Sequence, residues 1–404
     1  MPYYSPNKSR RTSTYGGQRS FGGRSNSGGQ KRRGPAKSYI HPSKFVKAAS
    51  PREDVIYTPT NQFADFPFND LLQANLIAKG IVTPTAIQDQ AILPALEGKD
   101  VVGIANTGTG KTIAFALPML DRLMDDPNSH ALIMAPTREL AQQIEDECKI
   151  LAKGSGLFGA LLIGGSSMGI QLRDLRAKPR IVIGTPGRIK DHIERGTLAI
   201  GKFNIVVLDE VDRMLDMGFI DDMRNILQKI SEVRQSFFFS ATMDSKVASL
   251  INGFTNDVVT ISVKTGETSE NVEQDIVAYQ TPNEKIEQLH QLLISEKVTK
   301  ALVFDETQRS VERLYEELAS RGFKADAIHG GKSQAHRQRA LDKFKKNHVS
   351  ILVATDVAAR GIDVTDISHV INYSQPQAYD DYIHRIGRAG RAGRLGYAYT
   401  FVRA

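Results

Sequence analysis

The chain has 404 residues, of which 41% are hydrophobic and 24% are charged, and its formal net charge is +7. Such a length accommodates two or three globular domains. Cys148 is the single cysteine, so no internal disulfide can form, and the N-terminal MPYYSPNKSR lacks the apolar stretch of a secretory signal. No apolar run is long enough to span a bilayer. We therefore expect no membrane partner and a cytoplasmic location. The stretch KRRGPAK is also compatible with a nuclear signal, although an RNA-binding tail explains it equally well.

The charge is concentrated at the N-terminus. Residues 1–50 contain eleven Lys or Arg and no acidic residue, and removing these charges from +7 leaves −4 for the rest of the chain. Glycine and serine dominate among residues 1–60, which offer too few apolar side chains to offset the entropy of ordering. We predict a disordered basic tail over residues 1–60. Tyr15 and Phe21 lie among its arginines and could stack on RNA bases, although a solubilising tail without a partner is the alternative.

From residue 61 onward, short apolar runs alternate with longer amphipathic stretches. Residues 131–137, 180–186, 204–210 and 236–242 each read as a buried strand that ends in polar residues, and residues 137–153 read as a helix. Strands that alternate with helices predict a parallel sheet covered on both faces. The polar, glycine-containing residues 263–270 predict a linker, after which a second series of the same kind begins. The sequence thus predicts an α/β protein with domains at 61–262 and 271–404.

Residues 101–112, VVGIANTGTGKT, run from a predicted strand through a glycine-rich loop into a predicted helix. Backbone N–H groups in such a loop form a cradle for phosphate anions. We expect the lysine to reach the β- and γ-phosphates of ATP and the following threonine hydroxyl to bind Mg²⁺. An ordinary glycine-rich turn with a surface lysine is the alternative, and the flanking strand and helix argue against it. The predicted nucleotide-binding residues of this loop are Thr107, Gly108, Thr109, Gly110, Lys111 and Thr112.

A carboxylate pair follows a later strand, in the stretch IVVLDEVD. A phosphate loop requires a carboxylate to hold its metal ion, and we expect Asp209 to bind Mg²⁺ through water. Glu210 is then placed to polarise the attacking water as a general base. The alternative is that both residues only cap the next helix.

The phosphate loop begins with Ala105, and the pattern A-x-T-G-x-G-K-T is the form found in superfamily-two helicases. The chain resembles the DEAD-box RNA helicases, with their motifs in order from Phe63 to Arg391, although Val211 replaces the family's alanine in Asp-Glu-Ala-Asp. The resemblance implies two RecA-like domains and ATP and Mg²⁺ as cofactors. It also implies that Gln88, in GIVTPTAIQ, reads adenine and that Phe63 stacks on it, while Ile81 stands where the family usually has an aromatic residue.

The remaining motifs acquire their roles from the same resemblance, although most could alone be turns or helix caps. The implied RNA-backbone contacts are Pro136, Thr137, Arg138, Gly164, Gly165, Thr185, Arg188, Gln334, Arg337 and Thr355. The implied coupling residues between the two domains are Asp212, Ser240, Thr242, His384 and Arg385. In the second domain, Gly361 and Asp363 would approach the ATP ribose, and Arg388 and Arg391 would be arginine fingers at the γ-phosphate.

The resemblance implies an ATP-dependent RNA helicase whose domains close on ATP and RNA, with low sequence specificity because its contacts are made to the backbone. We expect a monomer that has protein partners in ribonucleoprotein assemblies. An ATP-gated RNA clamp and a DNA-directed translocase are the alternatives. Family members usually continue with a helix after the position of Ala404. Its absence predicts exposed apolar surface in the second domain, lower stability, or a sequence that is a truncated fragment.

Overall fold

The computed structural model describes residues 40–50, 57–106, 108–255, 257–263, 270–295, 297–359, 364, 366–390 and 394–404. The part of the predicted tail before Ile40 and the core of the predicted linker lie outside these ranges. Among the described residues, no helix combines the length and the apolarity that crossing a membrane requires.

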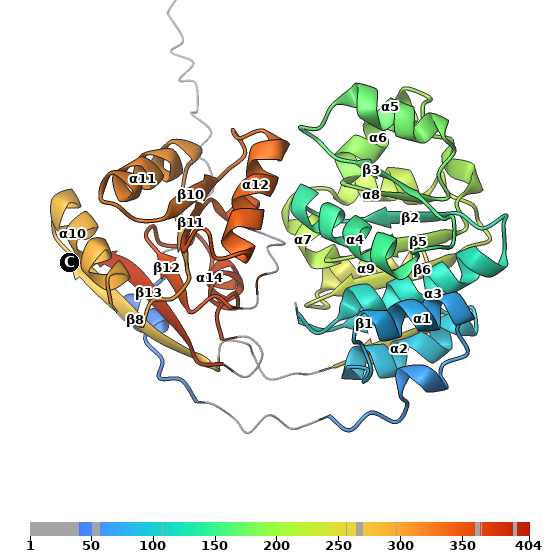
Figure 1. The fold of residues 1–404 in the computed structure, drawn as a ribbon, viewed down its shortest axis with the longest axis horizontal. Coiled ribbons are helices and arrows are strands. Elements are labelled where there is room, and N and C mark those ends of the chain that lie inside the picture. The colour runs from blue at the N-terminus through green and yellow to red at the C-terminus, as the bar shows by residue number, and fades with distance from the viewer. Residues whose placement is uncertain are drawn as a thin grey trace, which may run out of the picture. The chain divides into compact units, whose positions relative to one another are not determined.

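The first sheet has seven strands in the order β3-β4-β2-β5-β6-β1-β7, and neighbouring strands are parallel (Figure 1). Its strands are β1 (Asp100–Ile104), β2 (Ala131–Met134), β3 (Gly159–Leu162), β4 (Ile181–Gly184), β5 (Ile205–Leu208), β6 (Gln235–Ser240) and β7 (Val258–Ser262). The helices around it are α1 (Asp70–Ala78), α2 (Ala86–Leu96), α3 (Lys111–Asp125), α4 (Arg138–Leu151), α5 (Met168–Arg176), α6 (Pro186–Glu194), α7 (Val211–Asp216), α8 (Ile220–Leu227) and α9 (Ser245–Asn252), with short 3-10 turns at Phe63–Asp65 and Ile200–Lys202.

The second sheet has six strands in the order β10-β11-β9-β12-β13-β8, again parallel. Its strands are β8 (Val272–Tyr279), β9 (Ala301–Phe304), β10 (Ala325–Ile328), β11 (Ile351–Ala354), β12 (His369–Asn372) and β13 (Gly396–Arg403). Its helices are α10 (Pro282–Leu293), α11 (Gln308–Ser320), α12 (Gln334–Lys345), α13 (Asp356–Ala359) and α14 (Tyr379–Ile386).

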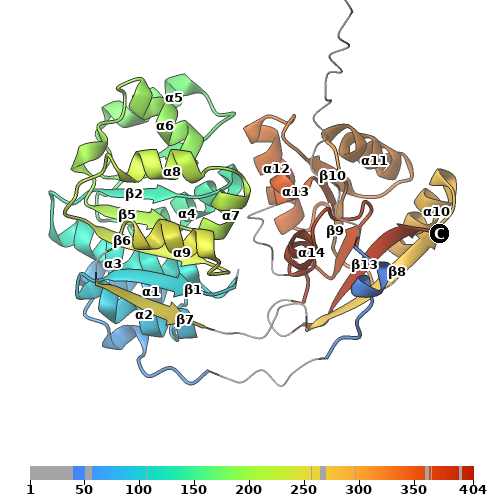
Figure 2. The same ribbon diagram turned by 180° about the vertical axis from the view of Figure 1, so that it is seen from behind.

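Each sheet is buried on both faces, because successive side chains of a strand point to opposite sides. In β6, Phe237 joins the apolar cluster under α1 to α4, whereas Phe238 joins the cluster under α6 to α9. Figures 1 and 2 show these two helical layers on opposite faces of the first sheet. Leu302 and Val303 of β9 divide in the same way between the two clusters of the second sheet. The predicted fold class, two tandem parallel-sheet α/β domains, is confirmed, while the exact domain boundaries stay predictions.

The prediction of disorder extends too far along the chain, because residues 40–50 are ordered in the structure. Residues Pro42–Phe45 form the 3-10 turn η1, and Phe45 is fully buried in the apolar cluster between the second sheet and α14. Ile40 is partly buried against the same cluster. The composition of residues 1–60 as a whole hid this short apolar stretch, whose burial depends on a surface formed more than two hundred residues later in the chain.

Candidate active site

The glycine-rich loop connects β1 to α3 and has the backbone conformation that its glycines permit. Gly108 and Gly110 have φ angles of 84° and 90°, in the left-handed region that side chains disfavour. A Cβ on Gly110 would also collide with the amide nitrogen of Gln88. Lys111 is the first residue of α3, and its ammonium donates a hydrogen bond to the carbonyl of Ala105 across the loop at 2.9 Å. The predicted loop therefore has the curled backbone and the inward lysine of a phosphate cradle.

Gln88 ties this loop to α2. Its side-chain oxygen accepts from the backbone N–H of Thr85 at 2.8 Å, and its nitrogen donates to the carbonyl of Gly110 at 3.0 Å. Thr85 adds a second tie by donating from its hydroxyl to the carbonyl of Thr109 at 2.7 Å. A glutamine amide has four hydrogen-bonding positions, so capacity for a ligand remains. The predicted adenine contact stays a prediction, and the described role of Gln88 is to hold the loop.

Phe63 has a different environment from the one that adenine stacking requires. Only 2% of its surface is exposed, and its ring packs against Phe66 with centroids 6.0 Å apart. Gln73 donates to the carbonyls of both residues at 2.9 Å. In this structure Phe63 is a core residue, and stacking on a base stays a prediction that needs one ring face to open.

The sequence did not reveal Asp89, which anchors the segment that leads into this region. Its buried carboxylate accepts four hydrogen bonds, from the hydroxyl of Tyr57, the N–H of Thr60, and the N–H and side-chain amide of Asn61. Burial acts to raise the pKa of Asp89, but these hydrogen bonds outweigh burial and hold the pKa below the ordinary value of 3.8. An acidic residue directly after the glutamine of the motif was the available signal.

Asp209 and Glu210 follow β5 at the same edge of the sheet as the phosphate loop. Asp209 is 2% exposed, and burial raises its pKa to about 7, although the charge of Lys111 opposes this rise. Glu210 has a φ angle of 55° and donates its N–H to the Asp209 carboxylate at 3.0 Å. The left-handed conformation costs a non-glycine residue about 1–2 kcal/mol. Such local strain persists where the surrounding structure imposes it, often at functional sites.

The residues present suit a magnesium ion held jointly with nucleotide phosphates. Asp209 is a buried carboxylate whose charge Lys111 compensates only in part, and Thr112 lies next to Lys111 at the start of α3. The described residues contain no cluster of three His, Cys, Asp or Glu side chains suited to a metal. Mg²⁺ typically takes one or two protein ligands, several waters and substrate phosphates. We therefore assign Asp209 and Thr112 as the protein's candidate contribution to the metal site.

Asp212 joins the carboxylate motif to the end of β6. Its carboxylate accepts from the N–H groups of Ala241 and Thr242 at 3.2 and 3.1 Å and from the Thr242 hydroxyl at 3.2 Å. Ser240 completes the link, because its hydroxyl lies 3.4 Å from the N–H of Asp212 and its carbonyl accepts from Ala105 in the phosphate loop at 3.0 Å. The structure thus connects the loop, Asp212 and Ser240–Thr242 in one hydrogen-bonded chain.

The RNA-contact residues predicted in the first half gather at the carboxyl ends of β2, β3 and β4. Thr137 caps α4 by accepting from the N–H of Leu140 at 3.2 Å, so its alternative role as an N-cap is present. Arg138 extends from the start of α4 over Gly164 and Gly165, so closely that a Cβ on Gly165 would collide with its guanidinium. The two motifs, separate in sequence, therefore form one surface.

Thr185 and Arg188 complete this edge of the sheet. Thr185 precedes α6 and donates its N–H to the carbonyl of Leu162 in β3 at 3.0 Å. Arg188 lies within the first turn of α6, with its guanidinium 3.8 Å from the carboxylate of Asp191. Open parallel sheets bind ligands at this edge, so the predicted RNA contacts occupy a suitable position.

A buried polar pair supports the Gly164–Gly165 loop and was missed in the sequence. Gln171 of α5 is 1% exposed and donates to the carbonyls of Ile163 and Ser166 at 3.1 and 3.3 Å. His192 of α6 is fully buried, with one ring nitrogen 3.2 Å from the Gln171 oxygen. Burial lowers the pKa of His192. Gln171 and His192 thereby hold the Gly164–Gly165 loop in place, and neither residue belongs to a motif recognised in the sequence.

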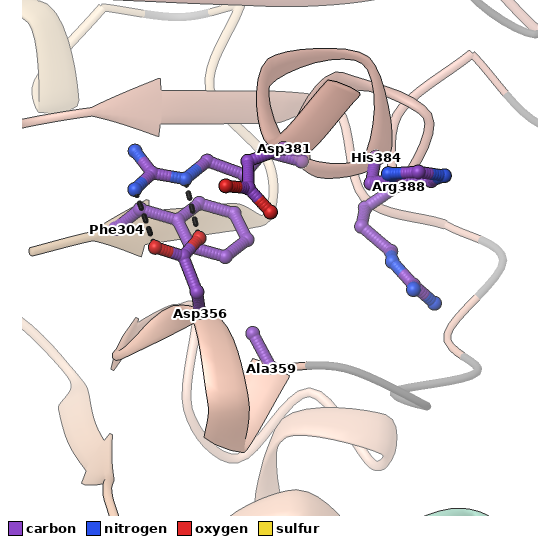
Figure 3. A pocket seen from close by; sticks show the side chains of 7 residues that line it. Phe304, Asp356, Ala359, Asp381, His384 and Arg388 are labelled. Carbon is purple, nitrogen blue, oxygen red and sulfur yellow. Dashed lines mark hydrogen bonds and ion pairs between the residues drawn. The ribbon is translucent and has the colours of Figure 1, made fainter. Parts of the chain in front are cut away.

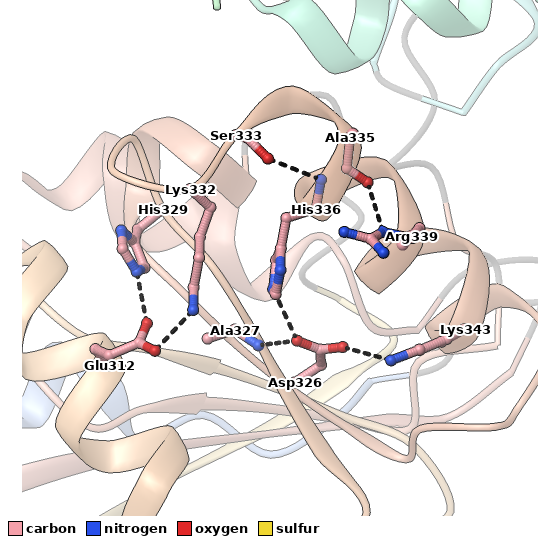
Figure 4. A network of polar contacts seen from close by, with 10 residues as sticks. All are labelled: Glu312, Asp326, Ala327, His329, Lys332, Ser333, Ala335, His336, Arg339 and Lys343. Atoms are coloured by element: carbon pink, nitrogen blue, oxygen red, sulfur yellow. Dashed lines mark hydrogen bonds and ion pairs between the residues drawn. The ribbon is translucent and has the colours of Figure 1, made fainter.

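In the second half, Gln334 and Arg337 lie one turn apart at the beginning of α12. Two ionic groups fix this helix and the loop before it (Figure 4). Glu312 accepts from His329 and Lys332 at 2.8 and 2.7 Å, which anchors the loop to α11. The second group, whose members were likewise not predicted, joins β10 to α12 through Asp326, His336 and Lys343 with separations of 3.4 Å. Thr355 follows β11 and is nearly buried.

Arg385 of α14 is committed to the interior of the second half. Its guanidinium makes a bidentate contact with Asp356 at 2.5 and 2.7 Å and donates to Asn372 and to the carbonyl of Ser374 at 3.1 and 2.8 Å. Figure 3 shows the small pocket beside Asp356, with Arg388 on its far side. The pocket is lined by Phe304, Asp356, Ala359, Asp381, His384, Arg385 and Arg388. A coupling role for Arg385 stays a prediction, and the described role is to seat α14 on β12 and α13.

Four predicted nucleotide-site residues cannot be placed. Thr107, Gly361, Asp363 and Arg391 lie outside the described residues.

Known families match both halves of the chain. The model of the DEAD/DEAH box helicases matches residues 85–250, and that of the helicase conserved C-terminal domain matches residues 284–393. The chain is 41% identical over 345 residues to DEAD-box ATP-dependent RNA helicase CshA of Bacillus subtilis (strain 168), an alignment that spans 85% of this chain and 70% of the relative.

The chain belongs to the DEAD-box family of ATP-dependent RNA helicases. A second relative, ATP-dependent RNA helicase CshA of Listeria monocytogenes, is 42% identical, with 85% of this chain and 66% of the relative covered.

Solved structures of this family share the fold. The structure of Dbp5 of S. cerevisiae bound to RNA and ADP BeF3 matches with a TM-score of 0.74 and 29% identity, over 85% of this chain and 89% of that one. Mss116p bound to ssRNA and AMP-PNP matches with a TM-score of 0.76 and 29% identity, over 88% and 77%. The RecA-like architecture expected from the sequence is therefore confirmed.

Proposed function

We propose that this DEAD-box protein couples ATP binding and hydrolysis to local unwinding or remodelling of RNA. One observation carries the proposal: a continuous hydrogen-bonded chain runs from the phosphate loop through Ala105 and Ser240 to Asp212, next to the proposed general base. Hydrolysis of the bound nucleotide can therefore alter the position of the Ser240–Thr242 segment through direct hydrogen bonds.

The ATP site is assigned as follows. The N–H groups of the Gly108–Gly110 loop and the ammonium of Lys111 bind the phosphates, and Glu210 orients and deprotonates the attacking water. Mg²⁺, when bound by Asp209 and Thr112, supplies charge neutralisation at the phosphates. Arg388 and Arg391 are proposed to stabilise the charge that develops at the γ-phosphate, which in other phosphoryl-transfer enzymes contributes about 10³ to 10⁵ in rate.

The RNA contacts are proposed on both halves. Arg138 lies over Gly164 and Gly165, and Arg188 lies at the same edge of the sheet. The proposal gives the two arginines and the backbone of the glycines contacts with phosphates, which carry no sequence information. Gln334, Arg337 and Thr355 supply the corresponding groups of the second half. Recognition of the backbone predicts low sequence selectivity, and RNA is distinguished from DNA by its 2′-hydroxyl. Binding of RNA to both halves favours the state that completes the ATP site, which is the proposed basis of coupling.

The deciding experiment is steady-state ATP hydrolysis with no nucleic acid, with single-stranded RNA and with DNA of the same sequence, followed by strand displacement from a short RNA duplex. Glu210→Gln is the blank, because it keeps the shape of the side chain and removes the base. RNA stimulation that disappears in the variant supports the proposal. Hydrolysis that RNA does not change contradicts it, and stimulation without strand displacement favours an ATP-gated clamp.

Three further assignments are proposals. The chain acts in the cytoplasm as a monomer, within ribonucleoprotein assemblies. Its first domain spans residues 61–262 and its second residues 271–404, joined by residues 263–270. The basic residues before Ile40 add affinity for RNA without sequence selectivity, since phosphate contacts dominate such binding.

A further inference from the structure

Residues 40–50 precede the first sheet in sequence but pack on the second. Phe45 is fully buried, and its ring lies 4.8 Å from that of Tyr382 in α14 at an interplanar angle of 60°. The same apolar cluster includes Val272 of β8 and Ala398 of β13. A passive linker has no need to bury an aromatic side chain in a distant core, so the burial of Phe45 indicates that this segment is docked.

The backbone of this segment extends the second sheet. Lys47 and Gln274 form an antiparallel bridge, with N–H to carbonyl distances of 3.0 and 2.8 Å in the two directions. Ser50 continues the contact by donating its N–H to the carbonyl of Glu270 at 3.0 Å. Because β8 is the last strand of its sheet, its outer edge is free to pair in this way.

The bridge and the aromatic anchor converge on one helix. Gln274, whose backbone holds Lys47, accepts a hydrogen bond through its side-chain oxygen from the Tyr382 hydroxyl at 2.9 Å. Tyr382 is fully buried and lies one turn before Arg385, and Arg388 follows two residues after the end of α14. The segment therefore contacts the side of α14 that carries Tyr382, while Arg385 fixes α14 to Asp356.

Beyond residues 51–56, which the structure does not describe, the chain attaches to the first sheet through Asp89. Tyr57, Thr60 and Asn61 donate to this carboxylate, which directly follows Gln88. The N-terminal stretch is thus anchored twice, once on α14, which ends two residues before Arg388, and once on α2, which carries Gln88.

We propose that residues 40–50 are an intramolecular strap that positions α14, and with it Arg388, for hydrolysis. The proposal rests on the proposed ATPase function. The contacts described for the strap are with the second sheet, Glu270 and α14, so its loss is expected to slow turnover more than it weakens ATP binding.

The test compares full-length variants. Phe45→Ala removes the anchor, and Val46→Ala is the matched control, because Val46 is the next residue and 51% exposed. Lys47→Pro removes the amide that donates to Gln274 and leaves the buried side chains in place. Hydrogen exchange at the Lys47 and Gln274 amides reports whether the strap is docked, and ATPase assays give kcat and KM for ATP and for RNA.

Phe45→Ala is expected to accelerate exchange at both amides, and Lys47→Pro, which has no amide hydrogen at residue 47, is expected to accelerate exchange at the Gln274 amide. Both variants are expected to lower RNA-stimulated kcat about tenfold, with KM for ATP within twofold of the parent and Val46→Ala unchanged. A synthetic peptide of residues 39–50 added to the Phe45→Ala protein is expected to restore part of the lost kcat. Fast exchange with unchanged kcat in Lys47→Pro would overturn the proposal, as would slow exchange in both variants. If RNA does not stimulate ATP hydrolysis by the parent protein, the proposed function is wrong. In that case the hydrogen-exchange data still test whether residues 40–50 dock on the second sheet.

Discussion

The carboxylate of Asp212 is the most testable element of the proposed coupling, and the perturbation is Asp212→Asn. One carboxylate oxygen receives two backbone N–H groups and the Thr242 hydroxyl at 3.1–3.2 Å, and the other receives the N–H of Arg213 at 3.0 Å. An asparagine can place only one oxygen, so either the Ala241–Thr242 amides or the Arg213 amide must face an NH₂ group.

The magnitude follows from the bonds that are lost. A hydrogen bond to a charged group contributes roughly 1.5–3 kcal/mol, and leaving a buried donor unpaired costs about 1–3 kcal/mol. If the oxygen of the new asparagine faces Ala241 and Thr242, the variant lacks the carboxylate charge and the hydrogen bond from the Arg213 N–H. We therefore expect the free energy of unfolding of the first half to fall by about 2–4 kcal/mol. At roughly 2–4 °C per kcal/mol, the melting temperature falls by about 4–16 °C.

The assay combines thermal denaturation with RNA-stimulated ATP hydrolysis measured well below the transition. Asp212→Asn is expected to lower both, whereas Glu210→Gln is expected to abolish hydrolysis without a comparable fall in melting temperature. Asp221→Asn, on the exposed surface of α8, is the matched control and should change neither. If Asp212→Asn retains the parent's melting temperature and RNA stimulation, the hydrogen-bonded chain does not carry the coupling.

Three other predictions concern single sites. Gly110→Ala introduces a side chain at a φ of 90° and against Gln88, so nucleotide affinity measured with a fluorescent ATP analogue should fall at least tenfold; unchanged binding would show that the loop adopts another conformation with ATP. The pKa of Asp89 lies below 3.8, so its stabilising contribution is complete at neutral pH and is lost as the pH falls through its folded pKa. Hydrogen exchange of the amides bound to it should accelerate there, and Asp89→Asn should remove that acid-dependent change. Gln171→Leu leaves two carbonyls behind Gly165 unpaired, so KM for RNA should rise severalfold while hydrolysis without RNA is unchanged; an equal fall in both would indicate general destabilisation.

The sequence alone predicted the architecture, which the structure confirms, and it supplied the residues that are proposed for the ATP site. Buried runs such as residues 204–210 alternate with amphipathic stretches, and this pattern depends only on local order along the chain. The phosphate loop is equally local, since the glycines, the lysine and the threonine are neighbours whose conformations follow from their own covalent structure. Asp209 lies at the same edge of the sheet as the phosphate loop, because both follow the carboxyl ends of parallel strands.

Only the tertiary structure decided which residues support these motifs. Asp89 and Asp356 each follow a predicted site residue directly, but their roles depend on partners at least 28 residues away in the sequence. Gln171 supports a loop from a position that no motif marks. Phe45 is the clearest case, because its burial depends on β8, β13 and α14, which complete that surface only at the end of the chain. Local pattern specifies an element or a loop, whereas a long-range contact depends on where the fold brings the second partner, and a single sequence does not encode that position in any short stretch.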